Sequence, residues 1–118
     1  SGPREAFDAD RALARVEGDR ALFAEITGLF RGSAPERLRA VAEALARGDG
    51  EAAERAAHTL KGSIGNFEAG AAQEAARRVE ALAREGQMER AREAAVVLER
   101  EVGRLLAALG RYAEGHAA

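Results

Sequence analysis

The chain has 118 residues, enough to enclose one hydrophobic core and too few for two. Its 18 basic and 20 acidic residues are interspersed and give a net charge of -2, so we expect no nucleic-acid binding, which requires clustered positive charge. We also expect no membrane insertion, because no apolar run approaches the roughly 20 residues that span a bilayer and no signal-peptide pattern opens the chain.

Helix-favouring residues dominate the sequence, and no run rich in Val, Ile and Thr indicates a strand. The stretch "FDADRALARV" predicts a short first helix, which Asp8 caps and which ends at Gly18. Asp19 is expected to cap a second helix, "RALFAEITGLF", whose apolar residues follow helical spacing. The stretch "SAPE" has the pattern of a capping box, in which Ser33 would start a third helix and Pro35 would lie in its first turn.

The chain from this point is predicted to form four amphipathic helices, at about residues 34–47, 50–66, 69–85 and 88–109. Because only short loops join them, successive helices must be antiparallel, which predicts an up-and-down four-helix bundle. The one or two short helices before it are expected to cover one end of this single all-α domain. Residues 1–3 resemble a cloning remnant, and residues 111–118 are expected to form a flexible tail in which His116 is solvated.

The stretch "HTLKGSIGNF", residues 58–67, contains two glycines where a helix should avoid them, since each costs roughly 1 kcal/mol relative to alanine. Helical geometry places His58 on one face with Glu54, Arg55, Lys61, Gly62 and Gly65. The apolar residues point the other way, into the bundle: Ala53, Ala57, Leu60 and Ile64. His58 is therefore predicted to face outward, beside bare backbone that another molecule can approach closely.

Lys61 is the only lysine of the chain, and it lies one turn from His58. A neutral imidazole offers a nucleophilic nitrogen at cytoplasmic pH, and an adjacent ammonium group stabilises negative charge on a phosphoryl oxygen. The sequence has no glycine-rich nucleotide loop, Walker sequence or kinase signature, so we expect the phosphoryl donor to be a protein. We expect no metal site, because histidines, cysteines and carboxylates are not clustered at metal-ligand spacing.

The stretch "AHTLKGS", residues 57–63, resembles the signature of histidine phosphotransfer (HPt) domains. These domains are phosphorelay modules that pass a phosphoryl group between aspartates of response-regulator receiver domains. The similarity extends from "FDADRALARVEGD" through "ALARGDGEAAERAAHTLKGS" to "ARRVEAL", in the style of domains at the C-terminus of bacterial hybrid sensor histidine kinases. The resemblance implies a phosphorelay intermediate that carries phosphohistidine and has no ATP site of its own.

Carried over residue by residue, the resemblance implies that His58 is phosphorylated, that Lys61 supports the phosphoryl group and that Gly62 gives the receiver close access. The family often has Gln or Glu on the next helix, hydrogen-bonded to the imidazole, and the matching residue here is Glu80 in "RRVEAL". Such a bond would fix the tautomer of the ring and leave its other nitrogen free to attack. The alternative for Glu80 is an ordinary solvated position on a helix.

The face around His58 is expected to bind the receiver through Glu54, Arg55, Gly62, Gly65 and Glu68. Many members of the family have glycine at the position of Glu68, in "GNFEAG", so its charge could change the choice of receiver. Alternatively, Glu68 begins the helix over 69–85, where a carboxylate favours the N-terminal dipole. The preceding residue, Phe67, is expected to anchor the core.

The resemblance also implies partners and a location. Response-regulator receiver domains would be the partners, and the receiver would bind the Mg²⁺ ion, so the chain would need no cofactor of its own. We expect a cytoplasmic monomer, which could also be the cytoplasmic end of a membrane-anchored sensor kinase. The absence of cysteine fits a reducing compartment.

Two alternatives to the phosphorelay intermediate stay open. The motif is also similar to the phosphoacceptor domain of a chemotaxis-type histidine kinase, which favours Glu at the position of Glu80 and is phosphorylated by an ATP-bound catalytic domain. A receiver domain encoded just upstream would favour the relay, whereas a dimerisation and ATP-binding region downstream would favour the kinase. The other alternative is a non-catalytic helical adaptor, in which the face around His58 binds a partner without phosphorylation.

Overall fold

Aspartate caps and short loops divide the chain into helices. The computed structural model describes residues 5–116, which contain α1 (Ala9–Arg15), α2 (Arg20–Ala46), α3 (Gly50–Ile64), the 3₁₀ turn η1 (Gly65–Phe67), α4 (Gly70–Arg84) and α5 (Met88–Gly115). Asp8, Asp19 and Asp49 cap α1, α2 and α3, and each carboxylate accepts a backbone N–H at 3.0 Å. The caps predicted at Asp8 and Asp19 are confirmed.

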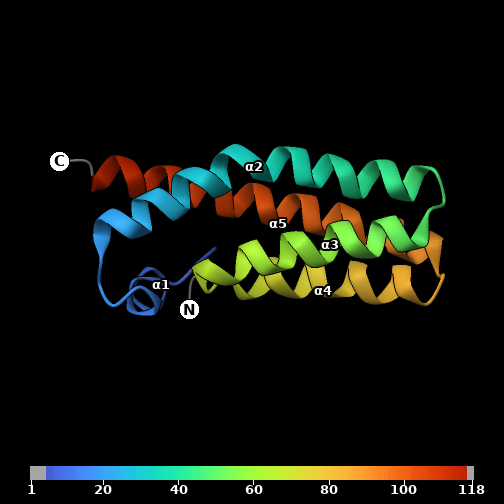
Figure 1. Ribbon diagram of the computed structural model, residues 1–118, viewed down its shortest axis with the longest axis horizontal. Helices are drawn as coiled ribbons and strands as arrows, with labels where there is room; N and C mark the ends of the chain where they lie inside the picture. Colours follow the sequence, from blue (N-terminus) through green and yellow to red (C-terminus); the bar gives the residue numbers. More distant parts are fainter. Residues whose placement is uncertain (1–4, 117–118) are drawn as a thin grey trace.

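The four long helices α2 to α5 form an antiparallel bundle, so the predicted all-α architecture is confirmed (Figure 1). α3 packs on α2 and on α4, α4 packs on α5, and α5 packs on α2, so the helices close a ring around one core. α3 and α5 therefore lie diagonally across the bundle. α1 lies at one end, below the N-terminal part of α2, and contacts η1 (Figure 1). Within residues 5–116, no helix has the length and apolar character needed to cross a membrane.

The core combines a tightly packed α3 with a cluster of aromatic rings near α1. The four residues of α3 that were predicted to face inward are completely buried: Ala53, Ala57, Leu60 and Ile64. Phe67 of η1 is also completely buried, and its ring centroid lies 6.1 Å from that of Phe23 and 5.0 Å from that of Phe30, both on α2. The prediction that Phe67 anchors the core is confirmed.

The predicted break between a second helix and a third helix over 34–47 is wrong. α2 is one continuous helix across both segments, with Pro35 inside it. Ser33 does not act as an N-cap, because its hydroxyl donates at 3.5 Å to the carbonyl of Phe30 within the same helix. The N-terminal part of α2 consequently belongs to the bundle, and α1 is the one short α-helix of residues 5–116 that lies at its end (Figure 1).

Tertiary packing explains why α2 continues past the proline. Pro35 removes one backbone hydrogen bond from the helix. The buried stripe nevertheless runs through this segment, since Phe30, Ala34 and Val41 are all nearly inaccessible to solvent. Burial of an apolar face supplies most of the stability of a helix in a protein, so it outweighs the loss of one hydrogen bond.

α5 is longer than predicted, since it reaches Gly115 instead of ending at residue 109. Tyr112 supplies the reason, because its ring packs edge-on against those of Phe7 and Phe23 at centroid distances of 5.9 and 5.7 Å. His116 is exposed, and its ring stacks on Tyr112 at a centroid distance of 3.9 Å. The flexibility predicted for residues 111–118 stays a prediction, and residues 117–118 lie outside the described residues. The expected cloning remnant at residues 1–3 also lies outside them.

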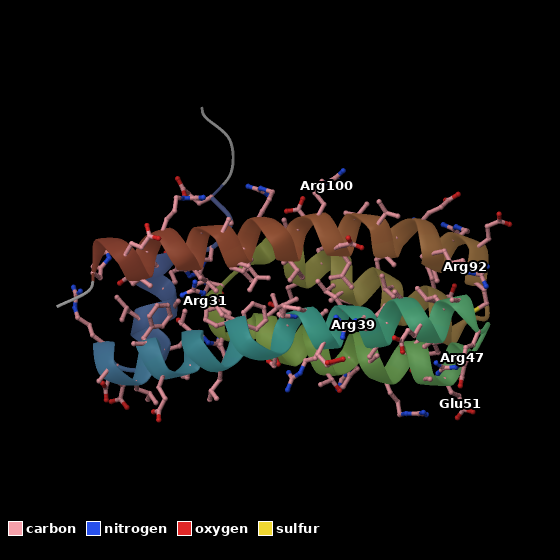
Figure 2. All side chains as sticks on the ribbon, turned by 90° about the horizontal axis from the view of Figure 1, so that it is seen from above. Arg31, Arg39, Arg47, Glu51, Arg92 and Arg100 are labelled. Atoms are coloured by element: carbon pink, nitrogen blue, oxygen red, sulfur yellow. The ribbon has the colours of Figure 1, made fainter. Side chains whose placement is uncertain are left out.

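Arg92 of α5 caps the other end of α2. Its Nε and Nη2 atoms donate to the carbonyl oxygen of Leu45 at 3.1 and 2.9 Å. The last carbonyls of a helix lack regular helical partners, so a cation with two donors is a favourable cap there. Figure 2 shows Arg92 near the end of the bundle where α2 finishes and α5 begins.

Gly50 lies where the start of α3 meets the end of α4. A Cβ atom at Gly50 would lie 3.0 Å from the carbonyl oxygen of Ala83, which belongs to the backbone and cannot rotate away. Gly50→Ala is therefore expected to lower the free energy of unfolding by about 1–3 kcal/mol in urea denaturation. Gly103→Ala is the control, because a Cβ there meets open space on α5, and it is expected to add about 0.5–1 kcal/mol. Equal effects of the two substitutions would contradict the close contact.

Candidate functional site

His58 stands in the middle of α3 with 66% of its side chain exposed, as its helical position predicts. The neighbouring Ala57 and Leu60 are completely buried, and they fix the rotation of the helix so that the imidazole faces outward. On the adjacent helix α4, Glu80 lies opposite the imidazole, and its side chain is only 7% exposed. The packing of α3 on α4 thus sets an exposed histidine against a buried carboxylate.

Glu80 holds two side chains of α3 with one carboxylate. Its Oε2 atom lies 2.7 Å from Nδ1 of His58, and its Oε1 atom accepts a hydrogen bond from Nζ of Lys61, also at 2.7 Å. The contact with the imidazole is the one that the family resemblance implied, and the bond to Lys61 was not expected. The structure therefore joins three of the predicted site residues in one hydrogen-bonded group.

The environment of Glu80 determines the tautomer of His58. Burial raises the pKa of Glu80, but the hydrogen bonds and charges of Lys61 and His58 outweigh it, so the pKa lies below its ordinary value of 4.5. The carboxylate is therefore ionised at neutral pH and can only accept hydrogen bonds. A neutral imidazole at His58 consequently carries its proton on Nδ1 and its lone pair on Nε2. The result is an exposed nucleophilic nitrogen held in a fixed orientation.

The lowered pKa of Glu80 predicts how the stability of the fold depends on pH. The ionised carboxylate stabilises the fold above about pH 4.5, and this contribution is lost as the pH falls through the folded-state pKa. Glu80→Gln removes the titrating group and weakens its charged hydrogen bonds, so it is expected to cost about 1–2 kcal/mol at neutral pH. The difference from the parent chain should shrink at about pH 3, as measured by urea denaturation.

Glu74→Gln is the matched control, because Glu74 is an exposed glutamate on α4 that pairs with Arg77 at 2.7 Å. It is expected to change the free energy of unfolding by less than about 0.5 kcal/mol. An equal cost of Glu80→Gln at both pH values would show that the ionised carboxylate is not the stabilising species.

A second ion pair extends the hydrogen-bonded group. Arg84 of α4 donates from Nη2 to Oε2 of Glu80 at 3.4 Å and from Nε to Oε2 of Glu54 at 2.6 Å. Glu54, which was predicted to contact the receiver, is thereby joined to the group around His58. Sequence analysis missed Arg84, although its i,i+4 spacing from Glu80 places both side chains on one face of a helix and is a signal for this contact.

Gly62 and Gly65 have different surroundings. A Cβ atom at Gly62 would meet nothing within 4 Å, so no contact among residues 5–116 requires glycine at this exposed position. A Cβ atom at Gly65 would lie 3.2 Å from Nε2 of Gln73 on α4. Gln73 also donates to the carbonyl of Lys61 at 3.5 Å, a role that nothing in the sequence signals. The backbone at Gly62 is therefore accessible from outside, whereas Gly65 accommodates a side chain of the same protein.

The other two predicted contact residues lie apart from this group. Arg55 is exposed on α3, about one turn before His58. Glu68 does not begin α4, because it adopts a left-handed backbone conformation with φ of 51° and the helix starts at Gly70. Its carboxylate lies 3.5 Å from Nη1 of Arg15 on α1, so it belongs to the end of the bundle that α1 covers.

Comparisons with known proteins agree with this geometry. The family model of the Hpt domain matches residues 25–108. The crystal structure of histidine-containing phosphotransfer protein B (HptB) from Pseudomonas aeruginosa PAO1 superposes with a TM-score of 0.86, at 28% sequence identity over 98% of this chain and 99% of that chain. No curated protein sequence matches. Because the family model spans most of the chain, the chain belongs to the Hpt family, whose domains take part in phosphotransfer with receiver domains in phosphorelays.

Proposed function

We propose that the chain is a phosphorelay intermediate, in which His58 accepts a phosphoryl group from a receiver aspartyl phosphate and passes it to an aspartate of another receiver. The observation that carries this proposal is the 2.7 Å contact between Glu80 and Nδ1 of His58, which leaves Nε2 as the attacking atom. In the forward step, Nε2 attacks phosphorus and forms the N–P bond. The P–O bond to the aspartate breaks, and its electron pair leaves with the carboxylate.

Glu80 acts in this proposal as a positioning residue. Attack by Nε2 produces a ring that carries the phosphoryl group on Nε2 and a proton on Nδ1, and this ring is positively charged. The carboxylate of Glu80 faces that proton and stabilises the charge. No proton has to leave the ring in either direction, so the same geometry serves acceptance and release.

Lys61 is proposed to stabilise the phosphoryl oxygens. Its side chain is 26% exposed and lies one turn from His58, where a flexible ammonium group can turn from Glu80 toward an incoming oxygen. The exposed backbone at Gly62 is proposed to give the receiver close access, and Glu54, Arg55 and Gly65 would lie in the contact area. Glu68 would lie at the edge of this surface, where its negative charge would affect which receiver binds.

The receiver is proposed to supply the Mg²⁺ ion, so that the chain needs no cofactor of its own. Mg²⁺ requires oxygen ligands, and the carboxylate beside His58 is already engaged by His58 and Lys61. We further propose that the chain acts as a monomer in the cytoplasm, which fits the absence of cysteine.

Transfer from a radiolabelled, phosphorylated receiver tests the proposal. The chain should become labelled, the label should be lost in acid and retained in base, as expected for phosphohistidine, and a second receiver should remove it. A chain that stays unlabelled by a panel of receivers and binds them equally with or without their phosphoryl group would be an adaptor. Labelling by an ATP-bound kinase catalytic domain, and by no receiver, would favour the chemotaxis-type alternative.

A further inference from the structure

A cavity of about 150 Å³ lies between α2 and the C-terminal part of α5, at the end of the bundle where α2 begins. None of its residues belongs to the group around His58. Its walls combine aromatic and small side chains with two arginines: Arg20, Phe23, Ala24, Thr27, Gly28, Arg31, Tyr112, Ala113 and His116. The extension of α5 beyond its predicted end builds one wall, so this cavity could not be foreseen from the sequence.

Thr27 provides the first observation that points to a ligand. Thr27 is 5% exposed, and its hydroxyl has no hydrogen-bond partner among residues 5–116. Buried polar groups in native proteins are almost always paired, so an unpaired hydroxyl on a residue that lines a cavity needs an explanation. A ligand atom that reached this hydroxyl could accept or donate a hydrogen bond and would supply the missing partner.

The two arginines provide the second observation. Within the described residues, neither Arg20 nor Arg31 forms an ion pair with a carboxylate. Arg31 extends toward α5, since its Nη2 atom would lie 3.5 Å from a Cβ atom at Gly110, and Figure 2 shows it between the two helices. Two exposed guanidinium groups without a carboxylate partner at the wall of one cavity are suited to an anion.

The size and the walls of the cavity indicate what kind of group would carry the negative charge of the ligand. A cavity of this volume accommodates a group about the size of benzene. Three rings line it: Phe23 meets Tyr112 edge-on at a centroid distance of 5.7 Å, and His116 stacks on Tyr112 at 3.9 Å, so a further ring would meet mainly aromatic walls. An inorganic anion would leave these apolar walls without contacts.

We propose that this cavity binds a small aromatic carboxylate. The ring packs against Phe23 and Tyr112, and the carboxylate accepts a hydrogen bond from Thr27 and interacts with Arg31 and Arg20. The site is independent of the phosphotransfer proposed for His58, because no residue is shared between them. Its test therefore needs no receiver and no phosphoryl group.

Titration of the isotope-labelled chain with benzoate, followed by NMR, tests the proposal. Saturable shifts are expected for the amides of Ala24, Gly28 and Ala113, and not for those around His58. Benzyl alcohol has the ring without the charge, and acetate has the charge without the ring, so each should bind at least about tenfold more weakly than benzoate. Equal binding of benzyl alcohol, or no saturable shift with benzoate, would overturn the proposal.

Two variants separate the site from a structural role of its residues. Arg31→Gln is expected to weaken benzoate binding about tenfold, whereas Arg39→Gln, an exposed arginine on α2 outside the cavity, should leave it unchanged. Thr27→Val removes a hydroxyl that has no partner in the free chain, so thermal stability should not fall while benzoate binding weakens. A folded Thr27→Val variant that binds benzoate as well as the parent chain would overturn the role of the hydroxyl.

Discussion

His58→Gln is expected to abolish labelling by a phosphorylated receiver, with a loss of at least about a thousandfold in the transfer rate. The amide group of glutamine can still donate a hydrogen bond to Glu80, but it has no nucleophilic nitrogen to form the N–P bond. Because 66% of the histidine side chain is exposed, the substitution should leave helicity and thermal unfolding close to those of the parent chain. Phosphate transfer is measured in the radiolabel assay, and helicity by circular dichroism.

Arg100→Gln is the control for this loss. Arg100 lies on α5, which is diagonal to α3 in the bundle, and Figure 2 shows it at the outer edge of the molecule. Its substitution should leave labelling unchanged. Residual labelling of the His58→Gln variant with the same acid lability would show that another group accepts the phosphoryl group, and the assignment of His58 would then be wrong.

Gly62→Gln should have opposite effects on stability and on transfer. Since a Cβ at Gly62 meets open space, the longer side chain finds no clash and gains helix propensity, which is expected to add about 0.5–1 kcal/mol to the free energy of unfolding. The same side chain would occupy the surface one turn from His58, where the receiver must approach, and transfer is expected to slow about tenfold or more. Urea denaturation and the initial rate of labelling measure the two effects.

Gly65→Ala is the comparison for this prediction. It adds only one methyl group, and Gln73 must shift to accommodate it. We therefore expect a small loss of stability and less effect on transfer than Gly62→Gln has. A lower free energy of unfolding for Gly62→Gln than for the parent chain would contradict the open surroundings of Gly62. Normal transfer by a stabilised Gly62→Gln variant would contradict the need for clearance.

Local signals in the sequence predict much of the site. Helical spacing alone places His58 outside and Ala57 and Leu60 inside, because α3 is amphipathic and its buried face determines its rotation. The contact between His58 and Glu80 joins two helices, and only the family resemblance suggested it. The bond between Lys61 and Glu80 was not predicted, because the distance between side chains on neighbouring helices depends on how the helices pack.

The errors in the predicted helix boundaries have the same cause, which is packing between segments that are distant in the sequence. The local sequence at Ser33 and Pro35 has the pattern of a helix start, but long-range burial keeps α2 continuous. At the end of α5, the sequence predicted a helix that stops at residue 109, whereas contacts of Tyr112 with Phe7 and Phe23 extend the helix. In both places a local preference of about 1–3 kcal/mol opposes apolar burial that only the folded chain provides.

The hydrogen-bonded group around Glu80 also determines how a receiver would distinguish the loaded protein from the empty one. Lys61 and Arg84 balance Glu80 and Glu54, so this group is electrically neutral when the imidazole is neutral. Under the proposed mechanism, the phosphoryl group brings two negative charges and the ring gains one positive charge, which leaves an excess of one negative charge. Loading would thus change the electrostatic potential around an otherwise balanced group. A receiver could then be attracted by one state and released by the other without any movement of the helices.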